Sequence, residues 1–159
     1  MKSINFYGLL FVFFLVSCGK KEKNISVYEY SLQRDSIKKF SLNIIKKQGF
    51  INFEYKHQID SLLNIDLKYN LAGNFLISDF DTFSVTKKVY KSKSLAFKIY
   101  QIKETNSHNK TLFFNNKYGL LSSIAFDANF LFLKDSISAN TKELIFKELF
   151  LNLNKLNIE

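Results

Sequence analysis

The 159-residue chain has no proline, no tryptophan, a single cysteine, two histidines and five glycines. One cysteine excludes a disulfide within the chain. A zinc site needs three or four ligands, so one built on the two histidines would have to be completed largely by carboxylates. Five scattered glycines exclude the glycine-rich loops that cradle phosphate groups. Because proline is missing, the sequence also lacks one of the strongest markers of where helices and strands end.

Aromatic residues and cations are plentiful. Aromatic residues make up 16% of the chain, and the formal net charge is +9. Phenylalanine and tyrosine favour the half-buried surface of a β-sheet. The positive charge favours anionic partners such as lipid headgroups or an acidic envelope polymer, although a genome that enriches lysine would give the same excess. The lysines are scattered rather than clustered, which does not indicate nucleic-acid binding.

The single cysteine, Cys18, ends an N-terminal apolar segment. Lys2 precedes this segment, and residues 7–16 supply about ten apolar or near-neutral positions, the length of an export signal. As a helix they would cover only about half of a hydrocarbon core of about 30 Å. Residues 15–18 (Leu-Val-Ser-Cys) resemble the lipobox of bacterial lipoprotein precursors.

This resemblance implies that residues 1–17 are a signal peptide that is removed, and that Cys18 becomes the lipidated N-terminus. The alternative is an uncleaved anchor helix or a helix in the core. Gly19 follows the cysteine where aspartate would favour the inner membrane, so the resemblance favours the outer membrane of a bacterial cell envelope. Residues 18–24 are then a lipidated basic tether, and residues 25–159 a single domain.

The first half of the mature chain predicts strands around one helix. Residues 25–32 are β-prone. The segment 36–47 begins with a capping serine, has apolar residues at helical spacing and ends in two lysines before Gly49, a pattern that predicts a helix. Residues 51–56 alternate between apolar and polar, which predicts a strand. Residues 57–64 fit either a short helix or a loop.

The second half predicts mostly hairpins and a final helix. Asn115–Lys117 is expected to form a turn, with a bulge near Gly119. The terminal helix has a capping residue at Asn140 and a broad apolar stripe, Ile145, Phe146, Leu149, Phe150, Leu153 and Leu156. The predicted strands are residues 65–69, 75–77, 83–90, 94–103, 111–114, 118–126 and 129–134.

Together these patterns predict an α+β fold. We expect a curved antiparallel sheet of about six or seven strands, with a helix in the N-terminal half and a C-terminal helix packed on one face. The C-terminal helix is expected to pack as core, with Leu149 buried. If the protein carries a ligand, the same helix would be a lid over a cavity.

Residues 79–82 (Asp-Phe-Asp-Thr) resemble the nucleophile segment of haloacid-dehalogenase-type phosphatases. In that family the first aspartate attacks phosphorus, and the second acts as acid or base and helps to hold Mg²⁺. Here the residue between the second aspartate and the threonine is missing, and the alternating strands downstream do not build a parallel α/β frame. We therefore interpret Asp79 and Asp81 as turn residues rather than catalytic or metal-binding ones.

No other residue set indicates an enzyme. His57 and His108 are far apart in sequence and lack partners at metal-ligand spacing. A Gly-x-Ser-x-Gly nucleophile motif is absent from the sequence. Ser36, Ser61 and Ser136 each stand between an aspartate and an aliphatic residue, similar to the O-glycan acceptor motif of some Gram-negative secretory pathways. The same triplet is typical of a helix N-terminus, and both explanations stay open.

Two functions remain open. The first is a non-enzymatic, membrane-anchored envelope lipoprotein that binds a protein or an acidic envelope component. The alternative is a carrier of a lipid or other apolar ligand, held in a cavity between the curved sheet and a helix. An apolar pocket of several hundred Å³ would favour the carrier. Neither function requires a metal, a cofactor or nucleic acid. The short paired strands resemble those of small bacterial lipoproteins, and this resemblance adds no active-site motif.

Overall fold

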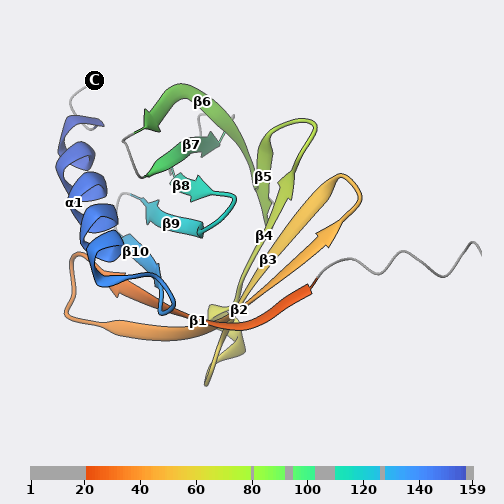
Figure 1. Ribbon diagram of the computed structural model, residues 1–159, viewed down its shortest axis with the longest axis horizontal. Coiled ribbons are helices and arrows are strands. Elements are labelled where there is room, and N and C mark those ends of the chain that lie inside the picture. Colours follow the sequence, from red (N-terminus) through yellow and green to blue (C-terminus); the bar gives the residue numbers. More distant parts are fainter. Residues whose placement is uncertain (1–20, 80, 92–94, 103–109, 126–127, 157–159) are drawn as a thin grey trace, which may run out of the picture.

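The computed structural model describes residues 21–79, 81–91, 95–102, 110–125 and 128–156. Ten antiparallel strands form a closed barrel in which each strand pairs with the next, and β1 pairs with β10 to close the ring (Figure 1). One helix, α1, follows. The elements are β1 (Lys21–Ser31), β2 (Ile37–Lys47), β3 (Phe50–His57), the 3₁₀ turn η3 (Ser61–Leu63), β4 (Ile65–Asn70), β5 (Phe75–Ser78), β6 (Asp81–Lys91), β7 (Ala96–Ile102), β8 (Thr111–Asn115), β9 (Gly119–Ile124), β10 (Asn129–Lys134) and α1 (Ala139–Leu156).

The interior of the barrel is built from alternate residues of the strands. Successive side chains of a strand point to opposite faces, so every second residue faces inward. The buried inward set consists mainly of large apolar side chains, and its size and continuity make the barrel lumen the main core. It contains Val27, Phe40, Leu42, Ile44, Phe53, Tyr55, Leu67, Tyr69, Leu76, Phe83, Tyr100, Leu112, Phe114, Leu120 and Phe132.

The predicted helix over 36–47 is wrong, because this segment is strand β2. Its buried residues, Phe40, Leu42 and Ile44, follow a period of two, and the helical spacing read from the sequence does not match them. Hydrogen bonds to β1 on one side and β3 on the other fix the segment in the sheet. Gly49 does not follow a helix. It occupies the two-residue turn to β3 at φ 78°, a backbone conformation that glycine adopts without a steric penalty.

The predicted fold class is also wrong. The protein is a ten-stranded antiparallel barrel with one C-terminal helix, and not an open curved sheet of six or seven strands with two helices on one face. Each predicted strand overlaps a strand of the barrel, and the segment mistaken for a helix adds another. Closure depends on pairing between the first and last strands, such as Val27 opposite Lys134. Pairing between such distant segments has no local sequence signal.

The C-terminal helix is confirmed, and it packs on the outside of the barrel. Ile145 and Leu149 are buried against outward-facing residues of β7 to β10, including Phe97, Phe113 and Leu131. In Figure 1 α1 stands beside β9 and β10, outside the ring of strands. The helix therefore forms a second core with the outer wall and does not cover the lumen.

Details of the helix differ from the sequence prediction. Ser138, and not Asn140, lies at the helix start, where its hydroxyl accepts a hydrogen bond from the Thr141 N–H at 3.3 Å. Leu144 packs against the outer core, whereas Phe146 is 45% exposed. The burial of Leu149, at 2% exposure, is as expected for a core residue.

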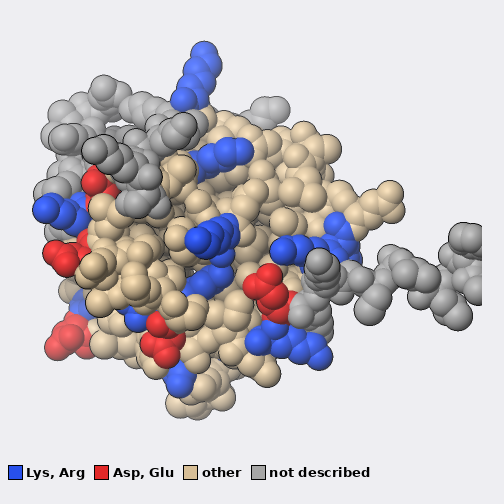
Figure 2. Space-filling model, viewed as in Figure 1, with Lys and Arg blue, Asp and Glu red and all other residues tan. Residues whose placement is uncertain are grey.

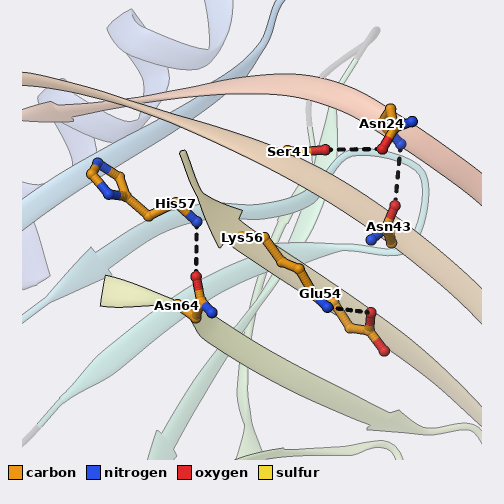
Figure 3. A network of polar contacts seen from close by, with 7 residues as sticks. All are labelled: Asn24, Ser41, Asn43, Glu54, Lys56, His57 and Asn64. Carbon is orange, nitrogen blue, oxygen red and sulfur yellow. Dashed lines mark hydrogen bonds and ion pairs between the residues drawn. The ribbon is translucent and has the colours of Figure 1, made fainter. Parts of the chain in front are cut away.

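Strand β1 begins within the segment expected to be a tether. Its pairing with β2 starts at Lys21, and the register shifts between Glu22 and Ile25. Asn24 has φ 59° at this irregularity. Figure 3 shows how it is held: the Asn24 N–H donates to Asn43 Oδ1 at 3.2 Å, and Asn24 Oδ1 accepts from the Ser41 hydroxyl at 3.3 Å.

The barrel has two different ends. The basal end contains the start of β1, the turns after β2, β4 and β8, and the end of β10. The mouth contains the connections after β1, β3, β5 and β9. Since neighbouring strands are antiparallel, these two groups of connections lie at opposite ends of the lumen.

Candidate ligand cavity

A cavity of about 440 Å³ lies in the lumen at the mouth. Its floor and walls are mostly apolar. The main apolar contributors are Phe40, Leu67, Leu112, Leu120, Phe130 and Phe132. A barrel of eight strands can already hold one small ligand, and a barrel of ten strands is wider.

The cavity forms because large rings fill the basal half of the lumen and small residues line the mouth. The ring of Phe114 contacts three others at the basal side, with centroid distances of 5.1 Å to Phe53, 5.4 Å to Tyr69 and 6.0 Å to Tyr100. At the mouth the wall positions include Ser78, Ser123, Ala125 and Ala128. This difference in side-chain size leaves the cavity at the mouth end of the core described above.

The basal end is closed by hydrogen bonds around Asn74. Its side-chain oxygen accepts from the Tyr69 hydroxyl at 2.9 Å, the Tyr100 hydroxyl at 3.2 Å and the Lys98 ammonium at 2.9 Å. Burial, and secondarily the nearby Tyr69, raise the pKa of Tyr100, so its hydroxyl stays protonated as a donor. The hydrogen-bonded cluster around Asn74 closes the packed half of the lumen.

A buried lysine also lies at the basal end. Lys134 is 7% exposed, and its ammonium donates to the Lys117 carbonyl at 2.9 Å. Burial lowers the pKa of Lys134, and the charge of Glu22 opposes that shift. The residue points into the lumen far from the cavity.

An ion pair is built into the cavity wall. The Glu29 carboxylate is 3.1 Å from the Lys38 ammonium, and the two side chains are 7% and 35% exposed. Lys38 also lies 5.5 Å from the ring centroid of Phe130. Burying a carboxylate without an opposite charge beside it is costly, and Lys38 supplies that charge.

Other polar groups face the same space. Ser78 and Ser123 are 5% and 7% exposed and line the cavity. Their hydroxyls make no hydrogen bond to a side chain or carbonyl within the described ranges. Lys110 lines the cavity as well, and it forms no ion pair with any residue that the structure describes. The wall therefore offers hydrogen-bond donors that the protein leaves available.

The lip of the mouth is the connection between β3 and β4. The His57 N–H donates to Asn64 Oδ1 at 2.9 Å (Figure 3), and the Asp60 N–H donates to His57 Nδ1 at 3.0 Å. Asp60 Oδ1 accepts from the Leu62 N–H at 2.9 Å and so caps η3. This fixed loop exposes Leu62, 91% accessible, at the edge of the cavity.

The structure places the residues considered from sequence as follows. Cys18 and His108 lie outside the described residues. His57 belongs to the lip of the mouth. Asp79, with φ 51°, and Asp81 are exposed at the turn between β5 and β6, and neither lines the cavity. The serines of the three Asp-Ser-aliphatic triplets are all exposed: Ser36, Ser61 and Ser136.

Sequence reasoning missed the polar residues of the cavity wall, Glu29, Lys38, Ser123 and Lys110. One signal was present for the first of them. In β1 the inward positions run Ile25, Val27, Glu29, so an acid stands where the alternation calls for an apolar residue. A charged residue on the buried phase of a strand indicates either a paired charge or a functional group.

Acidic residues also gather on the outer wall. Burial, and then the nearby Glu54, raise the pKa of Asp66, while Lys56 opposes the shift and Asp79 adds to it. Within the described ranges, no three histidine, cysteine, aspartate or glutamate side chains are placed to hold a metal ion. Among the described helices, none has the length and apolar character needed to cross a membrane.

Comparison with protein-family models, with curated proteins and with solved structures finds no match for this chain.

Proposed function

We propose that this protein is a lipid-anchored envelope protein that holds one small apolar or amphipathic molecule in its barrel. The observation that carries the proposal is the cavity of about 440 Å³ with an apolar floor. Small-molecule sites are concave, largely apolar and about 300–1,000 Å³ in volume, with a few polar groups. The cavity has each of these properties.

This proposal favours the carrier over a display module. A display module needs a packed core and a partner-binding face, and a lumen filled to both ends would have supported it. The carrier in our proposal differs from the one expected from sequence in one respect. Its ligand lies inside the barrel, and α1 is not a lid, because the helix packs on the outer wall.

The charge distribution supports an orientation for the tethered barrel. The basal end carries lysines, with Lys46, Lys47 and Lys117 at its strand ends and turns. In Figure 2 Lys and Arg side chains are spread over the face in view, and several of them lie at the right, the side on which β1 begins in Figure 1. Each cation near an anionic lipid surface contributes about 1 kcal/mol. We therefore propose that the basal end faces the anchoring membrane and the mouth faces away.

The cavity is tested by binding of N-phenyl-1-naphthylamine, a neutral dye that fluoresces in apolar surroundings. We expect saturable binding to the chain from residue 19 onward. Ser123→Phe places a ring in the cavity and should weaken binding at least about tenfold, since dye and ring cannot share the space. Ser84→Phe is the matched control, because Ser84 follows the inward Phe83 and so points outward. Thermal melts confirm that both variants are folded.

Absence of dye binding by the wild-type protein would overturn the proposal, as would equal binding by Ser123→Phe and wild type.

The anchor is tested separately. With Cys18→Ser we expect a product that is unprocessed or soluble and no longer partitions into the detergent phase, because the acyl chains have no attachment atom. Detergent-phase partitioning and apparent mass in the producing cells are the measurements. A variant that stays membrane-bound at the normal mature mass would contradict lipidation at this residue.

A further inference from the structure

We propose that the ligand is a single-chain amphipath with an anionic head, and that the head is held at the mouth by Lys110 with help from Ser123. This inference rests on the proposed function and adds the chemical class of the ligand. The anionic head is inferred from the arrangement of charges and hydrogen-bond donors around the cavity.

The carboxylate in the cavity wall is already paired with a lysine. Among the described residues of the cavity lining Glu29 is the acidic one, and its carboxylate already pairs with Lys38 at 3.1 Å. A cationic head would have to displace Lys38 from that pair and would then lie beside two ammonium groups. Like charges at short range in a partly buried site oppose binding. The Glu29–Lys38 pair is therefore a neutral part of the wall that does not select a cation.

Lys110 is the other cation near Ser123 at the cavity mouth. Lys110 precedes β8 and stands two residues before the inward Leu112, so the two share a face of the chain. Ser123 on β9 lies opposite Leu112. Phe130, whose ring lies under Lys38, stands opposite Ser123 on the other side. One stretch of wall thus joins the Lys110 ammonium and the Ser123 hydroxyl, which are donors suited to a negatively charged oxygen, beside the already paired Lys38.

The apolar tail of the ligand would lie deeper in the cavity. Below this wall the lining becomes apolar, with Phe40, Leu112, Leu120 and Phe132. The rings around Phe114 and the hydrogen bonds of Asn74 fill much of the basal half, where the described side chains of Lys98 and Lys134 already donate hydrogen bonds within the protein. A ligand with one polar end and one apolar end matches this gradient, with its head at the mouth and its tail inside.

The test compares ligands of equal chain length that differ in the head. Displacement of N-phenyl-1-naphthylamine is measured with decanoate, decyl phosphate, decanol and decyltrimethylammonium, all below their micellar concentrations. We expect the acids to displace the dye at concentrations about tenfold lower than decanol, because a charge-assisted hydrogen bond is lost in the alcohol. The cation should be the weakest. The ratio of decanoate to decyl phosphate shows whether the head is a carboxylate or a phosphate.

The residue assignment is tested with Lys110→Gln and Lys110→Glu. Lys110→Gln should reduce the preference for acid over alcohol to near unity without changing dye affinity. Lys110→Glu should shift the preference toward decyltrimethylammonium. Lys39→Gln is the matched control, because Lys39 neighbours Lys38 on β2 and contacts the ring of Tyr28 on the outer wall. It should behave as wild type.

Equal displacement by the acid, the alcohol and the cation would overturn the anionic head and leave the apolar cavity standing, since the dye would still bind. A preference for the cation would also overturn it, as would an acid preference that survives Lys110→Gln. Failure of the dye itself to bind would remove the proposed function and this inference together.

Discussion

Replacing Leu149 with alanine should lower the free energy of unfolding by about 2–5 kcal/mol and leave dye binding unchanged. Leu149 is 2% exposed in the core between α1 and the outer faces of β7 to β10. Its truncation removes buried apolar surface and leaves a void between two rigid elements. Because this core lies outside the lumen, the ligand cavity is not touched. Urea unfolding and dye titration of the same samples measure the two effects.

Leu62→Ala is the matched control for the stability of the Leu149 variant, and it is left out of the dye titration because Leu62 lies at the edge of the cavity. Leu62 is 91% exposed, so the same chemical change should alter stability by less than about 0.5 kcal/mol. If Leu149→Ala were as stable as wild type and instead released the dye, the helix would have to cover the ligand site. That outcome would contradict the outer packing of α1.

Gly119→Ala should destabilise the protein by about 2–5 kcal/mol, through two separate terms. Gly119 has φ 80°, a conformation that costs a residue with a side chain about 1–2 kcal/mol. An added methyl group would also overlap the Tyr55 hydroxyl, which accepts the Leu120 N–H at 2.8 Å inside the barrel. The overlap forces the fully buried Tyr55 to move and strains that hydrogen bond. Equilibrium unfolding in urea measures the total loss in the free energy of unfolding.

Two further variants separate the backbone cost from the cost of the overlap with Tyr55. Gly49→Ala has the same backbone cost, with φ 78°, but no atom lies within 4 Å of the added carbon, so it should lose only about 1–2 kcal/mol. In the Tyr55→Phe background the overlapping oxygen is gone, and Gly119→Ala should cost about as much as Gly49→Ala. A Gly119→Ala cost that is unchanged in that background would exclude the hydroxyl as the cause.

A strand could be predicted where one face of a segment is buried and the other is exposed to solvent. Residues 51–56 and 65–69 alternate cleanly, and both are strands. The same rule failed for residues 36–47, because Ile37 and Ile45 add apolar residues on the other face and mimic a helical period. Ile37 is in fact 62% exposed, so the sequence could not show which apolar residues would be buried.

The candidate site was less predictable than the strands. Glu29 gives a detectable signal because it interrupts an inward apolar series. Lys110 and Ser123 give none, since a lysine in a turn and a serine in a strand are ordinary surface residues. They become a site only because β8 and β9 lie beside β10 and β1 in the closed ring, which carries them to the same wall as Lys38.

The sequence by itself determined most strand positions and the C-terminal helix, and processing at Cys18 stays a prediction from its motif. These depend on side-chain periodicity, capping and motif, which act over a few residues. The tertiary structure alone decided that the sheet closes, that α1 lies outside it and that a cavity remains at the mouth. Closure joins β1 to β10 through contacts between distant segments. The cavity depends on the sum of side-chain volumes from many strands, a quantity that no single segment contains.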